Sequence, residues 1–160
     1  MTRAQMRVAI AKDVLKQISL HRIKIRAGGY WSIGPSGPSS FIYNIQPVGQ
    51  EEIKEKHCTV CAAGAAVTSA IRLFNEEKIS TRNSCDDDAV FIAGRRWFTK
   101  RQLAMIEAAF EDPGARPMVE HITFHEIDRC EQFAERNKSS IGRAKAIFEN
   151  IIENRGNFVP

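Results

Sequence analysis

The sequence predicts a mainly α-helical protein of about five helices with a small β element near residues 22–45. Apolar residues recur at helical spacing along most of the chain, two Thr-x-x-Gln/Glu patterns mark helix starts, and no repeat or linker divides the sequence. The 160 residues are 43% hydrophobic and 26% charged, as in one soluble globular unit. We therefore expect a single compact α+β domain over residues 1–160.

The N-terminal segment predicts a basic amphipathic helix over residues 3–20. Met6, Ile10, Val14 and Ile18 lie four residues apart, whereas lysines and arginines occupy other positions of the helical wheel. This spacing gives the helix one apolar face that can pack on the core, and the rest of its surface carries lysines and arginines.

The next segment predicts the β element. Ile23 and Ile25 alternate with cations, which is typical of a half-buried strand. Residues 34–40 consist only of Gly, Pro and Ser, a composition that excludes a helix and predicts a loop. Residues 41–45 then predict a second short strand.

A long central helix is predicted from Glu51 to about Glu77. Acidic residues stand at its start, where the helix dipole favours them, and apolar residues follow every three or four positions. Residues 61–66 are nearly all small, so another element can approach this helix closely. We expect this helix to form the centre of the fold.

Three further helices complete the prediction. Thr99 with Gln102 and Thr123 with Glu126 form capping boxes, each followed by an apolar stripe. The apolar residues of the last helix are Ile141, Ala144, Ile147, Phe148, Ile151 and Ile152.

The positive charge is concentrated at the N-terminus. The formal net charge is +4, but residues 1–30 hold seven Lys/Arg against one acid, whereas residues 31–160 hold sixteen basic and eighteen acidic side chains. No apolar run is long enough for a transmembrane helix or a signal peptide, so we expect a cytoplasmic protein without membrane contact.

The basic residues and their neighbouring aromatics predict a partner-binding surface. Cations and aromatic side chains are the groups that nucleic-acid binding needs, and arginine and aromatics also dominate protein interfaces. Direct DNA or RNA binding therefore remains an alternative to a protein partner. The candidate binding residues, expected to be exposed, are Lys12, Lys16, Arg22, Lys24, Arg26, Tyr30, Trp31, Arg95, Arg96 and Trp97.

His57, Cys58 and Cys61 are candidate zinc ligands, because thiolates and imidazole suit zinc. A structural zinc site needs four ligands, and the other cysteines and histidines are scattered along the chain. With Cys58 and Cys61 placed in the predicted helix, burial of small thiols in the core is the favoured interpretation. We expect no cofactor; a metal-dependent enzyme or zinc-stabilised module is the alternative.

Several segments together resemble a family of small uncharacterised proteins common in phages and prophages. The matching pieces are Trp31 and residues 61–65, 106–111, 150–154 and 156–160, which cover about the C-terminal two-thirds of the chain. The resemblance implies a phage or mobile-element origin, and the family carries no assigned activity to transfer.

Small phage accessory proteins often act by occupying a host protein. No complete catalytic constellation is present in the sequence, so we expect a non-catalytic protein rather than an enzyme. By analogy, the resemblance implies an anti-CRISPR-like inhibitor that binds a bacterial host or immune protein, such as a nucleic-acid-binding nuclease complex, in the host cytoplasm.

Overall fold

Five α-helices and a three-stranded sheet make up the part of the chain that the computed structural model describes. The described residues are 1–27, 31–33, 58–74, 94–111 and 119–160. The prediction of a mainly α fold with a small β element is confirmed. In chain order the elements are α1 (Arg3–Ser19), β1 (Ile23–Ile25), β2 (Trp31–Ile33), β3 (Cys58–Val60), α3 (Ala62–Phe74), α5 (Lys100–Phe110), the 3-10 turn η2 (Val119–His121), α6 (Phe124–Arg136) and α7 (Ser140–Glu153).

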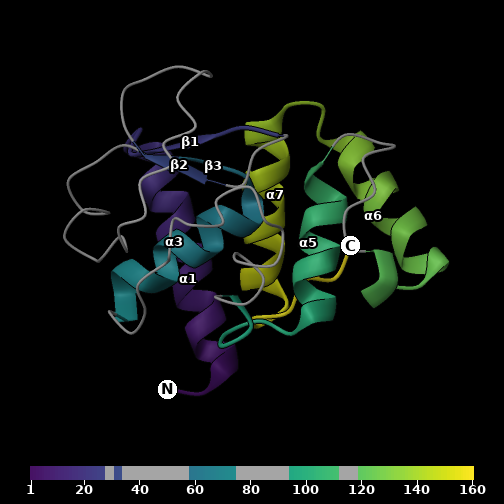
Figure 1. Ribbon diagram of the computed structural model, residues 1–160, viewed down its shortest axis with the longest axis horizontal. Coiled ribbons are helices and arrows are strands. Elements are labelled where there is room, and N and C mark those ends of the chain that lie inside the picture. Colours follow the sequence, from purple (N-terminus) through teal and green to yellow (C-terminus); the bar gives the residue numbers. More distant parts are fainter. Residues whose placement is uncertain (28–30, 34–57, 75–93, 112–118) are drawn as a thin grey trace.

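Helix α7 lies in the middle of the view in Figure 1, while α3, the helix expected at the centre of the fold, is buried over residues 62–71. Helix α7 packs between α1 and α5, α6 covers the far side of α5, and α3 crosses both α1 and α5. The sheet lies at the end of the bundle where α1 stops. None of the helices in the described ranges is long and apolar enough to cross a bilayer.

The N-terminal helix is confirmed almost residue for residue. Thr2 and Gln5 form a reciprocal cap: the Gln5 amide donates to Thr2 Oγ1 at 3.2 Å, and the Thr2 amide donates to Gln5 Oε1 at 2.8 Å. These bonds satisfy two backbone donors that an uncapped first turn would leave unpaired. The predicted apolar stripe faces inward, with Ile10, Val14 and Ile18 buried.

The predicted β element is present, and two of its three described strands, β2 and β3, were not predicted as strands. The strand expected at residues 22–26 is β1, and β2 begins at Trp31. β3 lies between them, parallel to β1 and antiparallel to β2. Residues 41–45, the predicted second strand, lie outside the described residues.

The prediction of one helix over residues 51–77 is wrong at residues 58–60. These residues form β3, in which Val60 pairs with Ile25 on one side and Trp31 on the other. Thr59 and Val60 are β-branched and suit a strand, and pairing on both edges outweighs their helical spacing. The helix itself starts at Ala62, and its small residues allow the predicted close packing: residues 62–71 are all buried.

The two predicted capping boxes differ in outcome. At Thr123 the box is complete: the Glu126 amide donates to Thr123 Oγ1 at 3.3 Å, and the Thr123 amide donates to Glu126 Oε2 at 2.9 Å. At Thr99 only half forms. The Gln102 amide donates to Thr99 Oγ1 at 3.1 Å, but the Gln102 side chain bonds the backbone of Phe158 instead.

The C-terminal segment is held by two side-chain amides, an arrangement we call the tail clasp. Gln102 Oε1 accepts from the Phe158 amide at 2.6 Å, and Gln102 Nε2 donates to the Phe158 carbonyl at 3.1 Å. The Asn150 side chain bonds the backbone of Val159 in the same pattern: its Nδ2 donates to the Val159 carbonyl and its Oδ1 accepts from the Val159 amide, both at 2.9 Å. The Phe158 ring is buried edge-on against Phe133, with centroids 5.2 Å apart.

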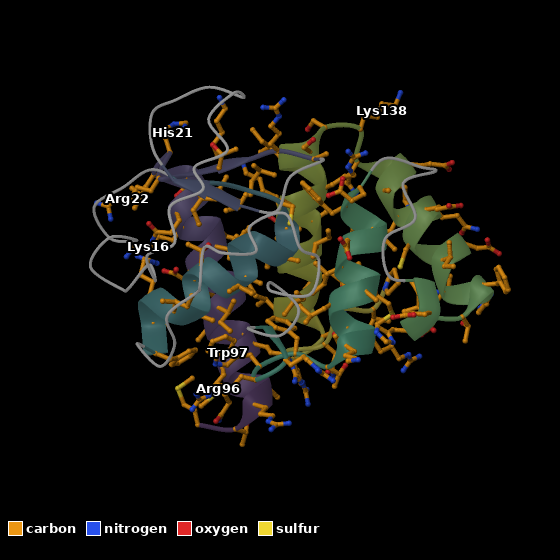
Figure 2. All side chains as sticks on the ribbon, viewed as in Figure 1. Lys16, His21, Arg22, Arg96, Trp97 and Lys138 are labelled. Atoms are coloured by element: carbon orange, nitrogen blue, oxygen red, sulfur yellow. The ribbon has the colours of Figure 1, made fainter. Side chains whose placement is uncertain are left out.

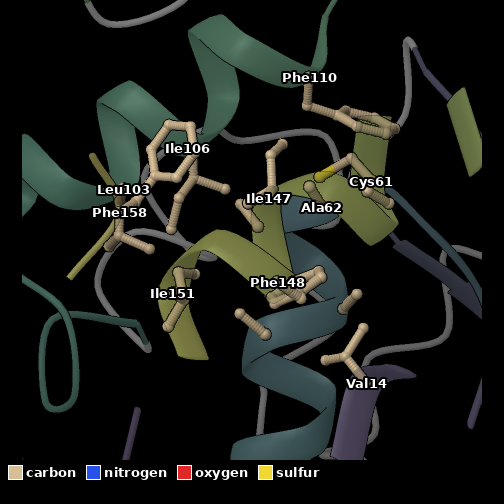
Figure 3. Close-up of a cluster of buried hydrophobic side chains, with 14 of the residues drawn as sticks. Val14, Cys61, Ala62, Leu103, Ile106, Phe110, Ile147, Phe148, Ile151 and Phe158 are labelled. Carbon is tan, nitrogen blue, oxygen red and sulfur yellow. The ribbon is translucent and has the colours of Figure 1, made fainter. Parts of the chain in front are cut away.

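The helices and the tail share one hydrophobic core (Figure 3). Each large side chain buried there contributes roughly 1.5–3 kcal/mol by leaving water. α7 supplies the central layer, and α1, α3, α5 and the tail close around it. The labelled members are Val14, Cys61, Ala62, Leu103, Ile106, Phe110, Ile147, Phe148, Ile151 and Phe158.

Candidate functional site

The predicted binding residues fall into two groups at different ends of the molecule. Figure 2 shows Lys16 and Arg22 near the sheet, whereas Arg96 and Trp97 lie at the opposite end, where α1 begins. Tyr30 lies outside the described residues, and the backbone of Trp31 forms the start of β2. We call the first group the N-terminal basic face; its members, all exposed, are Lys12, Lys16, Arg22, Lys24 and Arg26.

The N-terminal basic face lies on α1 and β1, two elements that pack together, and on the residues that flank β1, Arg22 and Arg26. Lys12 and Lys16 are one helical turn apart and therefore neighbours on the surface of α1. Lys24 lies between Ile23 and Ile25 in β1. Because alternate strand residues point to opposite sides and both isoleucines are buried, Lys24 faces solvent.

The only acid of residues 1–30, Asp13, is withdrawn from this face. It is buried between α1 and α3, where it forms an ion pair with Arg72. With its amide oxygen turned toward Arg72, Gln17 accepts from Nη1 at 2.9 Å and from Nη2 at 2.7 Å. Burial lowers the pKa of Arg72 from its usual range. No carboxylate of α1 or β1 therefore interrupts the exposed cations.

Trp97 is buried, so the expectation that its side chain is exposed is wrong. Its side chain is 2% exposed, and its ring stacks on Phe74 with centroids 6.5 Å apart. Arg95 and Arg96 before it are exposed as expected. Among the side chains that the structure describes, the largely exposed aromatic one is Phe124, at 83% exposure. Phe124 directly follows the cap residue Thr123, as at an ordinary helix start, so no local pattern indicates its exposure.

A second basic group forms around Arg7, which joins three segments distant in sequence. Its Nε donates to the carbonyl of Gly156, its Nη1 donates to the carbonyl of Trp97 at 3.1 Å, and its Nη2 donates to Asn157 Oδ1 at 3.1 Å. Each segment that Arg7 joins carries at least one further arginine. We call the exposed members the arginine end: Arg3, Arg95, Arg96 and Arg155.

Cys61 has a structural role at the start of α3. The Gly64 amide donates to Cys61 Sγ at 3.3 Å, and the Ala65 amide donates to the Cys61 carbonyl at 2.9 Å, so this residue caps the helix as a serine would. Cys58 is in β3, not in a helix, which corrects the sequence prediction for this pair. Burial raises the pKa of the Cys61 thiol to about 12.

Among the described residues, no three potential metal ligands lie close enough together to bind a zinc ion. Cys130 is buried, its thiol contacts the Met105 carbonyl at 3.5 Å, and burial raises its pKa to about 12. His57 and Cys85 lie outside the described residues, so zinc binding stays a hypothesis. Elemental analysis of the purified protein tests it directly.

We expect Cys61 and Cys130 to resist alkylation in the folded protein. A thiol with a pKa of about 12 is a thousandfold less ionised at neutral pH than an ordinary cysteine, by order of magnitude, and both sulfurs are buried. Iodoacetamide labelling followed by peptide-resolved mass spectrometry measures each site, and the denatured protein provides the reference rate. Rapid labelling of either residue in the native state would contradict its burial.

Comparison with profiles of known protein families, with curated proteins and with solved structures finds no match to this chain.

Proposed function

We propose that this protein is a non-catalytic binding protein whose N-terminal basic face docks on an acidic surface of a partner protein. The observation that carries the proposal is the burial of Asp13 against Arg72, which leaves the five exposed cations on and beside α1 and β1 without a carboxylate from these two elements. Such a set of exposed cations steers association with a partner of opposite charge.

A protein partner suits this face because an exposed apolar side chain lies between two of its cations in the sequence. Leu20 is 48% exposed at the end of α1, one turn after Lys16 and two residues before Arg22. An apolar contact inside a charged rim is the usual anatomy of a protein interface, whereas phosphates need only the cations.

The reactive side chains of the described residues support a binding role rather than catalysis. Cys61 and Thr123 cap helices, and Cys130 is buried with a raised pKa. The thiol or hydroxyl that could act as a nucleophile or a metal ligand is therefore part of a helix cap or of the buried core.

The resemblance to phage accessory proteins supplies the biological setting of the proposal. The partner would be a bacterial host or immune protein, and binding would inhibit it by covering a functional surface, as an anti-CRISPR protein does. A compact protein with a face of exposed cations suits this role because fast association favours inhibition.

Reversing the charge of the face is expected to slow association with the partner by at least about tenfold at low salt. The variant carries Lys12→Glu, Lys16→Glu, Lys24→Glu and Arg26→Glu. The partner is first captured from host lysate with the native chain, and its association rate is then measured by surface plasmon resonance over a salt series.

A matched control reverses exposed cations elsewhere. Lys138→Glu with Lys145→Glu is compared with Lys12→Glu and Lys16→Glu, so that net charge is equal. Only the Lys12/Lys16 pair should lower the association rate. An unchanged rate for the fourfold variant at low salt excludes this face as the docking surface, and a partner whose activity is unaffected by binding excludes inhibition.

A further inference from the structure

We infer that the arginine end is a second binding surface, one that contacts the phosphate backbone of duplex nucleic acid. It uses none of the residues of the N-terminal basic face. Arg3 and Lys16 are thirteen residues apart in α1, which places them about 20 Å apart along the helix axis at 1.5 Å per residue. The two surfaces can therefore be altered separately, and this inference does not depend on the proposed function.

The fold assembles the arginine end from three segments. Arg3 lies one helical turn before Arg7 in α1, Arg96 precedes the residue whose carbonyl accepts from Arg7 Nη1, and Arg155 precedes the Gly156 carbonyl that accepts from Arg7 Nε. The contacts of Arg7 span 90 and 149 residues of sequence. Arg7 thus joins the backbone segments that carry Arg3, Arg96 and Arg155.

The positive charge at the junction is not neutralised by the contacts of Arg7. All three of its acceptors are uncharged oxygens, two backbone carbonyls and one side-chain amide. Burial and the charge of Arg3 together lower the pKa of Arg7, so the cation is held where its neighbours disfavour it. An anion arriving from solvent would relieve this repulsion.

Arg155 adds a backbone observation to the charge. It adopts φ of 52°, the left-handed region in which Gly and Asn are the common residues. A long cationic side chain at this position costs conformational energy that glycine would avoid. The presence of arginine where the backbone favours glycine is consistent with a use for its guanidinium, which is exposed.

The composition of the surface points to phosphates rather than bases. Guanidinium groups match phosphate oxygens with paired hydrogen bonds, and regularly spaced phosphates can meet arginines that come from separate segments. The neighbouring aromatic residue, Trp97, is buried and offers no ring on which an unpaired base could stack. We therefore expect contact with the backbone of a duplex, without sequence preference.

The test measures binding of a fluorescently labelled duplex DNA of about 25 base pairs by fluorescence polarisation, at salt concentrations between about 25 and 200 mM, a range in which phosphate contacts are revealed by salt dependence. The arginine variant is Arg3→Ala/Arg96→Ala/Arg155→Ala. The matched control is Lys12→Ala/Lys16→Ala/Lys24→Ala, which removes the same charge from the other face. Circular dichroism melting verifies that each variant is folded.

We expect the native chain to bind the duplex with an affinity that falls steeply with salt. The arginine variant should lose at least about tenfold in affinity at low salt, and its slope of log affinity against log salt should be shallower by about 2 to 3, as expected for three lost phosphate contacts. The control variant should bind within about twofold of the native chain, because its residues lie outside the inferred contact.

Three results would overturn the inference. The first is no duplex binding by the native chain at low salt. The second is an equal loss in the arginine and control variants, which would assign binding to general charge. The third is binding of poly-glutamate, as an acidic polypeptide probe, with no binding of DNA, which would make the arginine end a protein surface.

The variant Arg155→Gly separates charge from structure. It removes one cation and relieves the left-handed backbone, so we expect weaker DNA binding with an unchanged or higher melting temperature, whereas Arg155→Lys should restore most of the binding. A variant Arg155→Gly that binds DNA as well as the native chain would exclude Arg155 from the contact.

Discussion

Replacing Gly156 with alanine is expected to lower the free energy of unfolding by about 3 kcal/mol. Two costs add: Gly156 has φ of 98°, where an L-residue is strained, and a Cβ there would lie 2.5 Å from the carbonyl oxygen of Ala4. Both clashing groups are fixed to backbone, so no rotamer change relieves the contact. Urea denaturation measures the loss, and the melting temperature should fall by about 10 °C for a chain of this size.

Gly142→Ala is the matched control for this substitution. Its Cβ would meet only the Ser139 hydroxyl, at 2.9 Å, and the added methyl group favours the helix by about 1 kcal/mol. Disturbance of the Ser139 cap offsets that gain by a similar amount. The control should therefore change stability by less than about 1 kcal/mol. Equal effects of the two substitutions would show that the approach of Gly156 to Ala4 is not a tight contact in solution.

The helices were predictable because their signals are local. Thr123 and Glu126 lie within one turn, so the capping box that the sequence indicates forms regardless of what packs nearby. The apolar stripe of the N-terminal helix similarly depends only on residues four positions apart. Where a local sequence pattern agrees with the tertiary packing around it, the sequence is sufficient to predict the helix.

The errors arose where distant segments compete with local pattern. Val60 satisfies helical spacing, yet it pairs with Ile25 and Trp31, which lie far from it in sequence. Gln102 is placed to complete a cap at Thr99, but its side chain is taken by Phe158, 56 residues away. Neither competitor can be recognised from neighbouring residues.

The candidate surfaces show the same division. The exposed cations of α1 were predictable because helical spacing separates them from the apolar stripe. The arginine end was not, because Arg155 and Arg96 become neighbours only through the contacts of Arg7 with Gly156 and Trp97. Burial of Trp97 likewise depends on Phe74, and an aromatic residue beside two arginines carries no local sign of that partner.

Phe158→Ala is expected to destabilise the protein by about 3–5 kcal/mol. The ring is 1% exposed and packs edge-on against Phe133, so truncation removes buried apolar surface and leaves a cavity. The hydrogen bonds of the tail clasp use the backbone of Phe158, which the substitution retains, and the loss therefore reports on the ring. Urea denaturation with an unchanged m-value measures it.

Val159→Ala is the control, since Val159 is largely solvent-exposed and receives the same kind of clasp from Asn150. It should cost less than about 0.5 kcal/mol, the usual range for an exposed position. Similar values for the two variants would mean that the tail is not docked in solution. If Phe158 does anchor the tail, its loss also frees Gly156 and Asn157 from Arg7, because these residues continue the same segment. DNA binding by Phe158→Ala should then weaken together with its stability, whereas Val159→Ala should leave both unchanged.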